Sequence, residues 1–524
     1  MDSHQLHEQL LRPGAWPDSG GRTVTSVETH VSRLYFVGDR VYKVKKPVDF
    51  GFLDFTTLEK RRFFCAEEVR LNDRFAPDTY LGVVELRREG NRVRAGGGGE
   101  LVDYAVAMRR LPRERMLDRL ITAGDPSLPR EMDRLARRLA RLHRDSEVCR
   151  EAGADLERVR TNWRENFEQS APLVGVTLER DALDLVRGHV EAFLARHGDL
   201  LRERESDGYV RDGHGDLHAE QVCLTEPIRI YDCIEFNRRF RVADTAADLA
   251  FLLMDLDFRG RRDLDADLLT AYRAAAGDDP GLDVLLPFYK LYRAWVRGKV
   301  DSFLAVDPDA DPGARAEATA LARRYFNLAL GYLVAPQLLL TCGLMGTGKS
   351  TLAAALARAT GARVLRSDVV RKELAGDRAE KSSEAPYGEG IYSEEFTAAT
   401  YARLLTLAAR ELDRGRPVIV DASFSRRRQR APFARAAADH GVPCRVLWTT
   451  CPEAATRQRL EERRRAGTDP SDGRPELLES QAKDFEPPTP DEGTIQVDTA
   501  AEVDYTLHLL LARLVKGQDG GILN

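Results

Sequence analysis

The sequence predicts an α+β fold with two lobes in the first half of the chain and an α/β fold with a parallel sheet in the second half. Between Thr23 and Met108, short alternating apolar segments of strand length dominate, and after Pro112 the pattern changes to helical periodicity. From Gln337 onward, apolar strands alternate with helices. We therefore expect four segments: an N-terminal lead at 1–22, a β-rich lobe at 23–111, a helical lobe at 112–334 and an α/β domain at 335–524.

Length and composition describe a globular protein with more than one core. The chain has 524 residues, 43% hydrophobic and 31% charged, and a net charge of −5, which gives no overall attraction to nucleic acid or an anionic membrane. Its start lacks the apolar segment of a signal peptide, and it holds no run of about twenty apolar residues. Seven cysteines occur without a C-x-x-C pair. We expect a cytoplasmic protein with reduced thiols and no membrane association; the sequence gives no indication of oligomeric state.

The β-rich lobe opens with a predicted hairpin, in which the alternating segments 33–37 and 40–44 flank a two-residue turn. A helix at about 56–74 follows, and Glu68 falls on its apolar face. Because a buried carboxylate needs a partner, Lys43 on the hairpin is its candidate ion-pair partner. The alternative is that Glu68 lies in water at the edge of the apolar stripe. Two more strands are expected, at 80–86 and 102–108, with a glycine-rich turn between them.

The stretch from His214 to Leu224 carries the chemical residues of the first half. Asp216 lies in a glycine-flanked loop, and Asp232 follows a short apolar strand further on. Two aspartates placed at the ends of one hairpin suit a reacting hydroxyl and a metal ion. Downstream, we expect Asp244 to cap a helix and Asp248 to brace the loop.

This stretch resembles the aminoglycoside phosphotransferase family, which shares the protein-kinase-like fold and whose catalytic loop reads H-G-D-x-H-x-x-N. The resemblance covers about 24–331. It implies that Asp216 accepts the proton of a substrate hydroxyl and that Asp232 binds Mg²⁺. It also implies that Lys43 and Glu68 form the ion pair at the ATP phosphates.

The chain departs from the family pattern at two places. Gln221 stands where the family has a metal-binding Asn; it offers the same amide oxygen one methylene further out, which a hard cation accepts. No G-x-G-x-x-G occurs in the β-rich lobe, so residues 29–33 would have to cover the phosphates.

The second half begins with the sequence Gly343-Leu344-Met345-Gly346-Thr347-Gly348-Lys349-Ser350, which fits the phosphate-binding pattern G-x-x-x-x-G-K-[ST]. An apolar strand at 337–342 precedes it and a helix at 351–358 follows, as the motif requires. Backbone N–H groups and the helix N-terminus would hold phosphate oxygens. Lys349 would reach the β- and γ-phosphates, and Ser350 would hold Mg²⁺. The alternative is a glycine-rich turn before an ordinary helix. The expected ATP-binding residues are Gly343, Gly346, Thr347, Gly348, Lys349, Ser350 and Thr351.

Further candidate residues follow the next strands. Asp368 is placed to act as a general base on an alcohol, or else to cap the following helix, and Arg371 to hold a substrate phosphate. Asp421 ends the buried strand 418–421, a Walker-B-like position for Mg²⁺. Arg459 and Arg463, four apart on a helix, are expected to clamp phosphates as part of a lid.

These marks, in particular Ser367-Asp368-x-x-Arg371, resemble the P-loop kinase group that includes zeta toxins, chloramphenicol phosphotransferase and polynucleotide 5′-hydroxyl kinases. The resemblance spans about 338–516 and implies ATP and a hydroxyl acceptor. The chain as a whole is similar to bacterial fusions of an aminoglycoside phosphotransferase-like protein with an ATP-binding protein.

Three hypotheses follow. The first is an ATP- and Mg²⁺-dependent phosphotransferase with two sites, each acting on a hydroxyl of a small molecule or nucleotide. The second narrows the second half to a polynucleotide 5′-hydroxyl kinase, which the arginine clusters suit and the net charge of −5 does not favour. The third makes the kinase-like half a non-catalytic nucleotide sensor, which Gln221 and the missing glycine loop favour.

Overall fold

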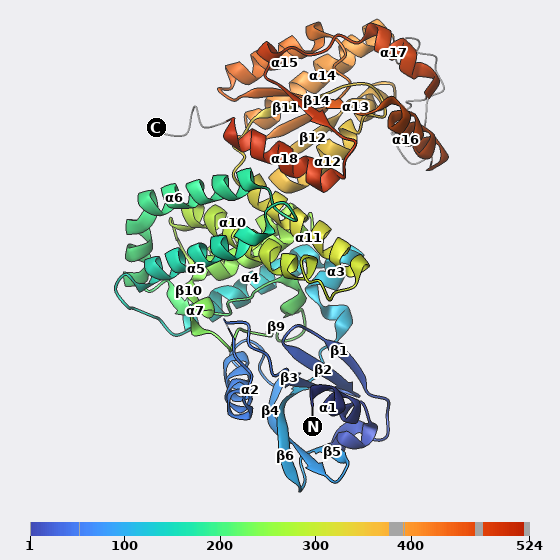
Figure 1. The fold of residues 1–524 in the computed structure, drawn as a ribbon. Helices are drawn as coiled ribbons and strands as arrows, with labels where there is room; N and C mark the ends of the chain where they lie inside the picture. Colours follow the sequence, from blue (N-terminus) through green and yellow to red (C-terminus); the bar gives the residue numbers. More distant parts are fainter. Residues whose placement is uncertain (1, 52, 377–390, 392, 467–474, 518–524) are drawn as a thin grey trace. The chain divides into compact units, whose positions relative to one another are not determined.

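The computed structural model describes residues 2–51, 53–376, 391, 393–466 and 475–517, which fall into two compact units (Figure 1). The first unit comprises Met1–Asn162 and Leu194–Lys290, and the second comprises Trp163–Phe193 and Leu291–Asn524. Both predicted fold classes are confirmed. The β-rich lobe lies in the first unit and the parallel sheet in the second, whereas the predicted helical lobe has residues in both units. The predicted domain limits, including the one between 334 and 335, stay predictions.

A six-stranded antiparallel sheet forms the β-rich lobe of the first unit, in the order β1-β2-β3-β6-β4-β5. Its strands are β1 (Thr25–Glu28), β2 (Ser32–Val37), β3 (Arg40–Lys45), β4 (Tyr80–Glu89), β5 (Arg92–Ala95) and β6 (Glu100–Arg109). The hairpin of β2 and β3 is as predicted. Strand β5 was missed, and the glycine-rich turn lies between it and β6.

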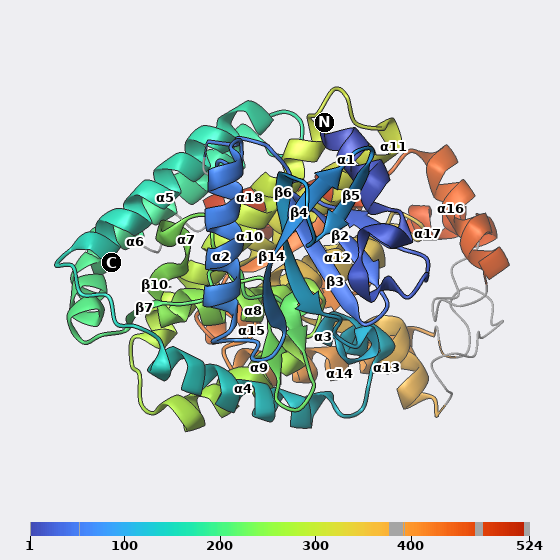
Figure 2. The same ribbon diagram turned by 90° about the horizontal axis from the view of Figure 1, so that it is seen from below.

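The two faces of this sheet are covered by different helices. Helix α2 (Leu58–Asn72) packs against β4 and β6 (Figure 2), and α1 (Ser3–Leu10) packs on the opposite face with Trp16. Because side chains alternate along a strand, Tyr42 and Val44 of β3 join the α1 cluster, while Lys43 and Lys45 face α2.

Helices make up most of the remainder of the first unit. They include α3 (Leu117–Ala123), α4 (Leu128–Asp145), α7 (Arg238–Arg241), α8 (Thr245–Phe258) and α9 (Arg262–Ala276). The loop 213–221 lies between two short antiparallel strand pairs. Strand β7 (Val210–Asp212), which precedes the loop, pairs with β10 (Val242–Asp244), and β8 (Val222–Cys223), which follows it, pairs with β9 (Arg229–Ile230). Helices α5 (Ala154–Ser170), α6 (Arg180–Ser206) and α10 (Leu282–Ala305) have residues in both units.

The second unit contains a five-stranded parallel sheet in the order β12-β13-β11-β14-β15. Its strands are β11 (Leu338–Cys342), β12 (Arg363–Arg366), β13 (Val418–Asp421), β14 (Cys444–Thr450) and β15 (Thr494–Asp498). Helices α14 (Glu394–Leu412) and α15 (Arg427–Asp439) cover one face, and α12 (Lys349–Thr360) and α18 (Val503–Lys516) the other (Figure 1). The unit also contains helices α11 (Pro312–Gly331), α13 (Ser367–Leu374), α16 (Glu453–Ala466) and α17 (Leu478–Asp484).

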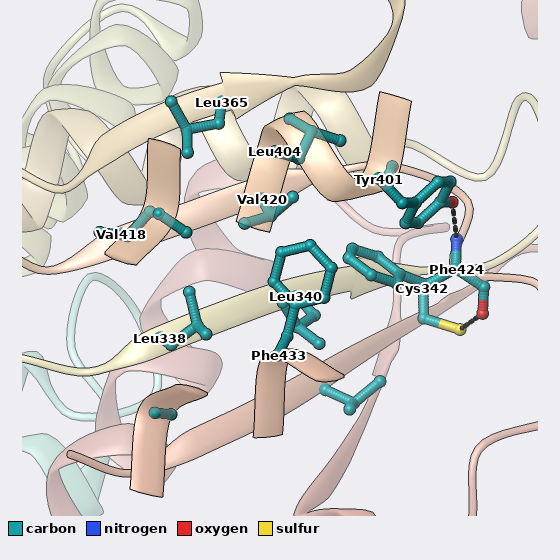
Figure 3. Close-up of a cluster of buried hydrophobic side chains, with 14 of the residues drawn as sticks. Leu338, Leu340, Cys342, Leu365, Tyr401, Leu404, Val418, Val420, Phe424 and Phe433 are labelled. Atoms are coloured by element: carbon teal, nitrogen blue, oxygen red, sulfur yellow. Dashed lines mark hydrogen bonds between the residues drawn. The ribbon is translucent and has the colours of Figure 1, made fainter. Parts of the chain in front are cut away.

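The core under α14 and α15 fixes the strand ends that carry the candidate site (Figure 3). All five residues of β11 are buried, as expected for a central strand covered on both faces. Leu340, Val420 and Leu404 belong to this cluster, and the Tyr401 hydroxyl accepts a hydrogen bond from the Phe424 N–H at 3.1 Å. The chain leaving β13 is therefore held at the point where Asp421 ends the strand.

Helix α11 packs against α12 and α18 within the second unit. The Asn327 side chain donates to the Asp504 carbonyl oxygen at 2.9 Å, and its amide oxygen lies 2.9 Å from His508 Nδ1. Burial lowers the pKa of His508 to about 4, so this histidine is neutral at physiological pH. Among the described residues, no helix has the length and apolar character needed to cross a bilayer.

Candidate functional site

In the first unit, the structure brings together the predicted pair Lys43 and Glu68. Glu68 is fully buried, and its Oε1 lies 2.9 Å from Lys43 Nζ. Lys43 Nζ also lies 2.6 Å from Asp232 Oδ1. Burial disfavours the charge on Lys43, but the carboxylates of Asp232 and Glu68 outweigh it and raise its pKa well above the ordinary value. The alternative of a solvated Glu68 is wrong.

A second lysine joins this network, which sequence reasoning missed. Lys45, two residues further along β3, lies 2.6 Å from Glu68 Oε2 and also contacts Glu235. Burial raises the pKa of Glu68, but Lys43 and Lys45 together lower it to about 2. The sequence did contain a signal for Lys45. Because residues two apart in a strand point to the same face of the sheet, a lysine at 43 that faces the buried helix places the side chain of residue 45 on that face as well.

The loop 213–221 is held by a carboxylate from helix α8. Asp248 accepts hydrogen bonds from the N–H groups of His214 at 2.6 Å and Gly215 at 2.8 Å. A Cβ at Gly213 would lie 2.4 Å from Asp248 Oδ2, so the close approach requires glycine. Asp244 caps α8 by accepting from the Ala246 N–H. The bracing and capping predicted for these two aspartates are thus observed.

Asp216 and Gln221 meet in this loop. Gln221 Nε2 donates to Asp216 Oδ2 at 2.9 Å, and His218 Nε2 lies 3.6 Å from the same oxygen. Gln221 Oε1 is buried and has no hydrogen-bond partner among the described residues. A buried amide oxygen of this kind is a donor that Mg²⁺ accepts, so the residues present fit a metal ion.

Asp232, the other predicted aspartate of this site, has an unusual backbone conformation. Its φ is +65°, in the left-handed region, and its N–H donates to the Tyr80 hydroxyl at 3.0 Å. A non-glycine residue in this region is strained, and surrounding contacts must hold it there. The segment 29–33, expected to cover the phosphates, lies at the turn of the β1–β2 hairpin.

In the second unit, the predicted phosphate-binding loop joins β11 to α12. Gly343, Gly346 and Gly348 have φ of +139°, +77° and +81°. A Cβ at Gly343 would lie 2.6 Å from the Thr449 carbonyl oxygen, and one at Gly346 would lie 2.9 Å from Leu460. The backbone conformation favours glycine at all three positions, and the lack of space requires it at Gly343 and Gly346. The simple alternative of a glycine-rich turn gives no reason for such close packing.

Lys349 Nζ donates to the Leu344 carbonyl oxygen at 2.7 Å, across the loop. Burial lowers its pKa, against the opposing effect of Asp421 and Asp368. An anion bound in the loop would offset this cost of burial, because it favours the charged form of the lysine.

A cavity of about 900 Å³ opens above the loop. Predicted residues from four segments line it, namely Gly346, Gly348, Lys349, Ser350, Thr351, Asp368, Arg371, Asp421, Arg459 and Arg463. The predicted loop residues Gly343 and Thr347 lie behind this surface and contact Thr449. The Ser350 hydroxyl and the Asp421 carboxylate are oxygen donors of the type that Mg²⁺ takes, so these residues also fit a metal ion.

Asp368 is the second residue of helix α13, and the helix cap is Arg366, so the capping alternative for Asp368 is wrong. Arg366 Nε lies 3.5 Å from Asp421 Oδ2. The Arg371 guanidinium donates to the Ile391 carbonyl oxygen at 2.6 Å and to Thr397 Oγ1 at 3.2 Å. Arg371 is thus a buried part of the cavity wall.

Two contacts of the loop escaped sequence reasoning. Gln481 Oε1, on α17, accepts from the Met345 N–H at 2.7 Å. Arg459 donates to the Thr499 carbonyl oxygen at 2.7 Å, and the Thr499 hydroxyl donates to the Thr347 carbonyl oxygen at 2.9 Å. Neither Gln481 nor Thr499 belongs to a motif, and both reach the loop from more than a hundred residues away in sequence.

The comparisons with known proteins match both parts of the chain. Residues 338–488 match a family model described as "AAA domain". The chain is 34% identical over 418 residues to three mycobacterial proteins, in alignments that cover 79% of this chain and 80% of each relative. They are the uncharacterized proteins Mb2027c of Mycobacterium bovis and MT2060 and Rv2004c of Mycobacterium tuberculosis.

Solved structures resemble one half or the other. A gluconokinase from Sinorhizobium meliloti 1021 matches with 22% identity and a TM-score of 0.27, covering 36% of this chain and 99% of its own. A choline/ethanolamine kinase family protein from Mesorhizobium loti matches with 16% identity and a TM-score of 0.35, covering 62% of this chain and 98% of its own.

Proposed function

We propose that this chain, which belongs to one family with the three mycobacterial proteins, is a kinase with two ATP–Mg²⁺ sites that each transfer a phosphoryl group to a hydroxyl. The phosphate-binding loop at 343–350, within the region 338–488 that matches the AAA-domain model, supports a kinase in the second half. The proposal adds that both ATP sites are catalytically active and that the acceptor at each site is a hydroxyl group.

The observation that carries the proposal is the cavity of the second unit. A phosphate-binding loop, a carboxylate on α13 and a carboxylate at the end of β13 line one space. In such a space Lys349 and the loop N–H groups hold the triphosphate, and Ser350 with Asp421 would hold Mg²⁺, which neutralises phosphate charge.

The reaction needs few groups from the protein. Asp368 accepts the proton of the acceptor hydroxyl as its oxygen bonds to the γ-phosphorus. The bond from that phosphorus to the β–γ bridging oxygen breaks, and ADP leaves. Arg459 and Arg463 offset the charge that spreads over the phosphoryl oxygens.

For the first unit, Asp216 takes the role of the proton acceptor, and Asp232 with Gln221 would hold Mg²⁺. A sensor function for this half is the second candidate. It is favoured by the ion pair of Lys43 with Asp232, because a metal ion at Asp232 would compete with the lysine for the same carboxylate.

Separate substitutions in the two units test both candidates. Phosphoryl transfer from γ-labelled ATP to a metabolite pool is measured for Asp216→Ala, Asp368→Ala and Lys349→Ala. If both units are kinases, Asp216→Ala removes one set of products and Asp368→Ala another. If only Lys349→Ala and Asp368→Ala abolish transfer, the first unit is a sensor. Transfer that survives in Lys349→Ala and Asp368→Ala together, at the wild-type level, contradicts a kinase in the second unit.

A further inference from the structure

The cavity of the second unit is lined by more basic side chains than a bound nucleotide needs. Lys349, Arg459 and Arg463 serve the nucleotide in the proposal above. Four further arginines also line the cavity: Arg366, Arg371, Arg426 and Arg428.

The sheet order separates these arginines from the lid arginines. Helix α16, with Arg459 and Arg463, follows β14, which lies on one side of β11. Arg366 ends β12 and Arg371 follows it, while Arg426 and Arg428 follow β13. Both strands lie on the other side of β11, as does the strand that leads to Asp368. Because ligands bind at the carboxyl ends of parallel strands, the second group lies on the side of Asp368, where an acceptor hydroxyl would have to bind.

Two of the four are built into the wall. Arg371 is buried and holds the Ile391 carbonyl oxygen, and Arg366 lies against Asp421. Their positive charge contributes to the field in the cavity, but their hydrogen bonds are directed at the protein.

Arg426 and Arg428 are different, because their ion-pair partners are exposed. Arg426 Nη2 lies 3.3 Å from Asp484 Oδ1, with side chains 44% and 47% exposed. Arg428 pairs with Glu394, with side chains 61% and 78% exposed. Exposed ion pairs contribute little to stability, so each guanidinium can exchange its partner for a ligand carboxylate or phosphate at small cost.

A shallow, open depression of the surface adjoins the cavity. It is lined by Arg426, Arg427, Arg428, Ala431 and Glu486, and Arg426 and Arg428 also line the main cavity. The two arginines therefore lie at the rim of the cavity, at the start of α15.

We propose that the acceptor of the second unit is a small anionic alcohol, whose carboxylate or phosphate is held by Arg426 and Arg428 while its hydroxyl faces Asp368. This inference rests on the proposed kinase function. The transfer step is unchanged: the hydroxyl proton goes to Asp368, the acceptor oxygen bonds to the γ-phosphorus, and ADP leaves with the bridging oxygen.

Matched pairs of probes test the charge requirement. The full chain is saturated with Mg²⁺ and AMP-PNP, and calorimetry measures the binding of glucose 6-phosphate against glucose and of glycerate against glycerol. A 5′-hydroxyl oligonucleotide is the third probe. The variants are Arg426→Gln with Arg428→Gln, and the control is Arg435→Gln, an exposed arginine on the same helix outside the cavity.

We expect at least one anion to bind about tenfold or more tightly than its neutral partner, since charge-assisted hydrogen bonds are the strong ones. The double variant should bring this ratio close to one, and the control should keep it. Relative to the double variant, Arg426→Gln combined with Arg428→Lys should restore part of the preference for the anion, because lysine keeps the charge but not the planar geometry of arginine.

Three results would overturn the inference: no preference for an anion, a preference that survives the double variant, or binding of the oligonucleotide alone. Failure of the proposed function has a different signature, because the wild-type chain would then bind Mg²⁺–AMP-PNP no better than Lys349→Ala does. A chain that binds the nucleotide through Lys349 but shows no anion preference refutes the charge requirement alone.

Discussion

Replacing Glu68 by Gln tests the ion network of the first unit. The carboxylate is fully buried between Lys43 and Lys45, and these lysines lower its pKa from 4.5 to about 2 in spite of burial. A decrease of this size corresponds to about 3 kcal/mol of stabilisation at neutral pH. Removing one partner of a buried ion pair costs about 3–5 kcal/mol in general. We therefore expect Glu68→Gln to lower the free energy of unfolding of the first unit by about 3 kcal/mol.

The dependence on pH has a defined sign. Because the pKa of Glu68 is lower in the folded state, its contribution is fully present above about pH 5 and is lost as the pH falls toward 2. The difference between wild type and Glu68→Gln should be about 1 kcal/mol smaller at pH 4 than at pH 7.

The free energy of unfolding of the first unit is measured by urea denaturation, with hydrogen-exchange mass spectrometry as the probe. Peptides from α2 and β3 report on the first unit alone, so unfolding of the second unit does not interfere. The control is Glu67→Gln on the same helix, whose partner Arg70 has a side chain 60% exposed. The control should cost at most about 1 kcal/mol. Equal losses in the two variants at pH 7, or a Glu68→Gln effect independent of pH, would refute the network.

Three further predictions concern the loops and one buried acid. Gly346→Ala should abolish MgATP binding in the second unit, since its Cβ would lie 2.9 Å from Leu460, whereas Gly376→Ala, with a similar φ but open space, should retain binding in calorimetry. Asp248→Asn replaces one of the two accepting oxygens by an N–H₂ group that faces a backbone N–H donor, and it should slow turnover in the first unit about tenfold, measured with the second site inactivated. Burial and the nearby charge of Asp244 raise the pKa of Asp155 to about 7. The folded state therefore binds the proton more tightly than the unfolded state, and the stability of the wild type declines as the pH rises from about 4 to 7. Asp155→Asn should therefore raise the melting temperature at pH 8 more than at pH 5, and an equal change at both would contradict this.

The elements that were predicted correctly are those whose signal is local. The phosphate-binding loop needs glycines at fixed spacing between a strand and a helix, and all of this information lies within about twenty residues. The hairpin of β2 and β3 is specified by alternation around a two-residue turn. The position of Asp421 at the end of a buried strand was predicted from the apolar residues that precede it, and its role in binding Mg²⁺ stays a prediction.

What was missed depends on contacts between distant segments. Glu235 becomes part of the Lys45 network only because the chain returns to β3 after nearly two hundred residues. Gln481 is a polar residue on a short helix, and nothing in the adjacent sequence indicates that its side chain accepts a hydrogen bond from the Met345 N–H. Strand β5 is short and rich in arginine, so its apolar signal is weak. Periodicity reports which face of an element is buried, and it does not report what that face meets.

Calorimetric titration with MgATP counts the nucleotide sites of the chain. We expect the wild-type chain to bind about two equivalents, with the binding event of the second unit missing in Lys349→Ala and that of the first unit missing in Lys43→Met. A Lys349→Ala chain that binds MgATP with the stoichiometry and affinity of the wild type would contradict it.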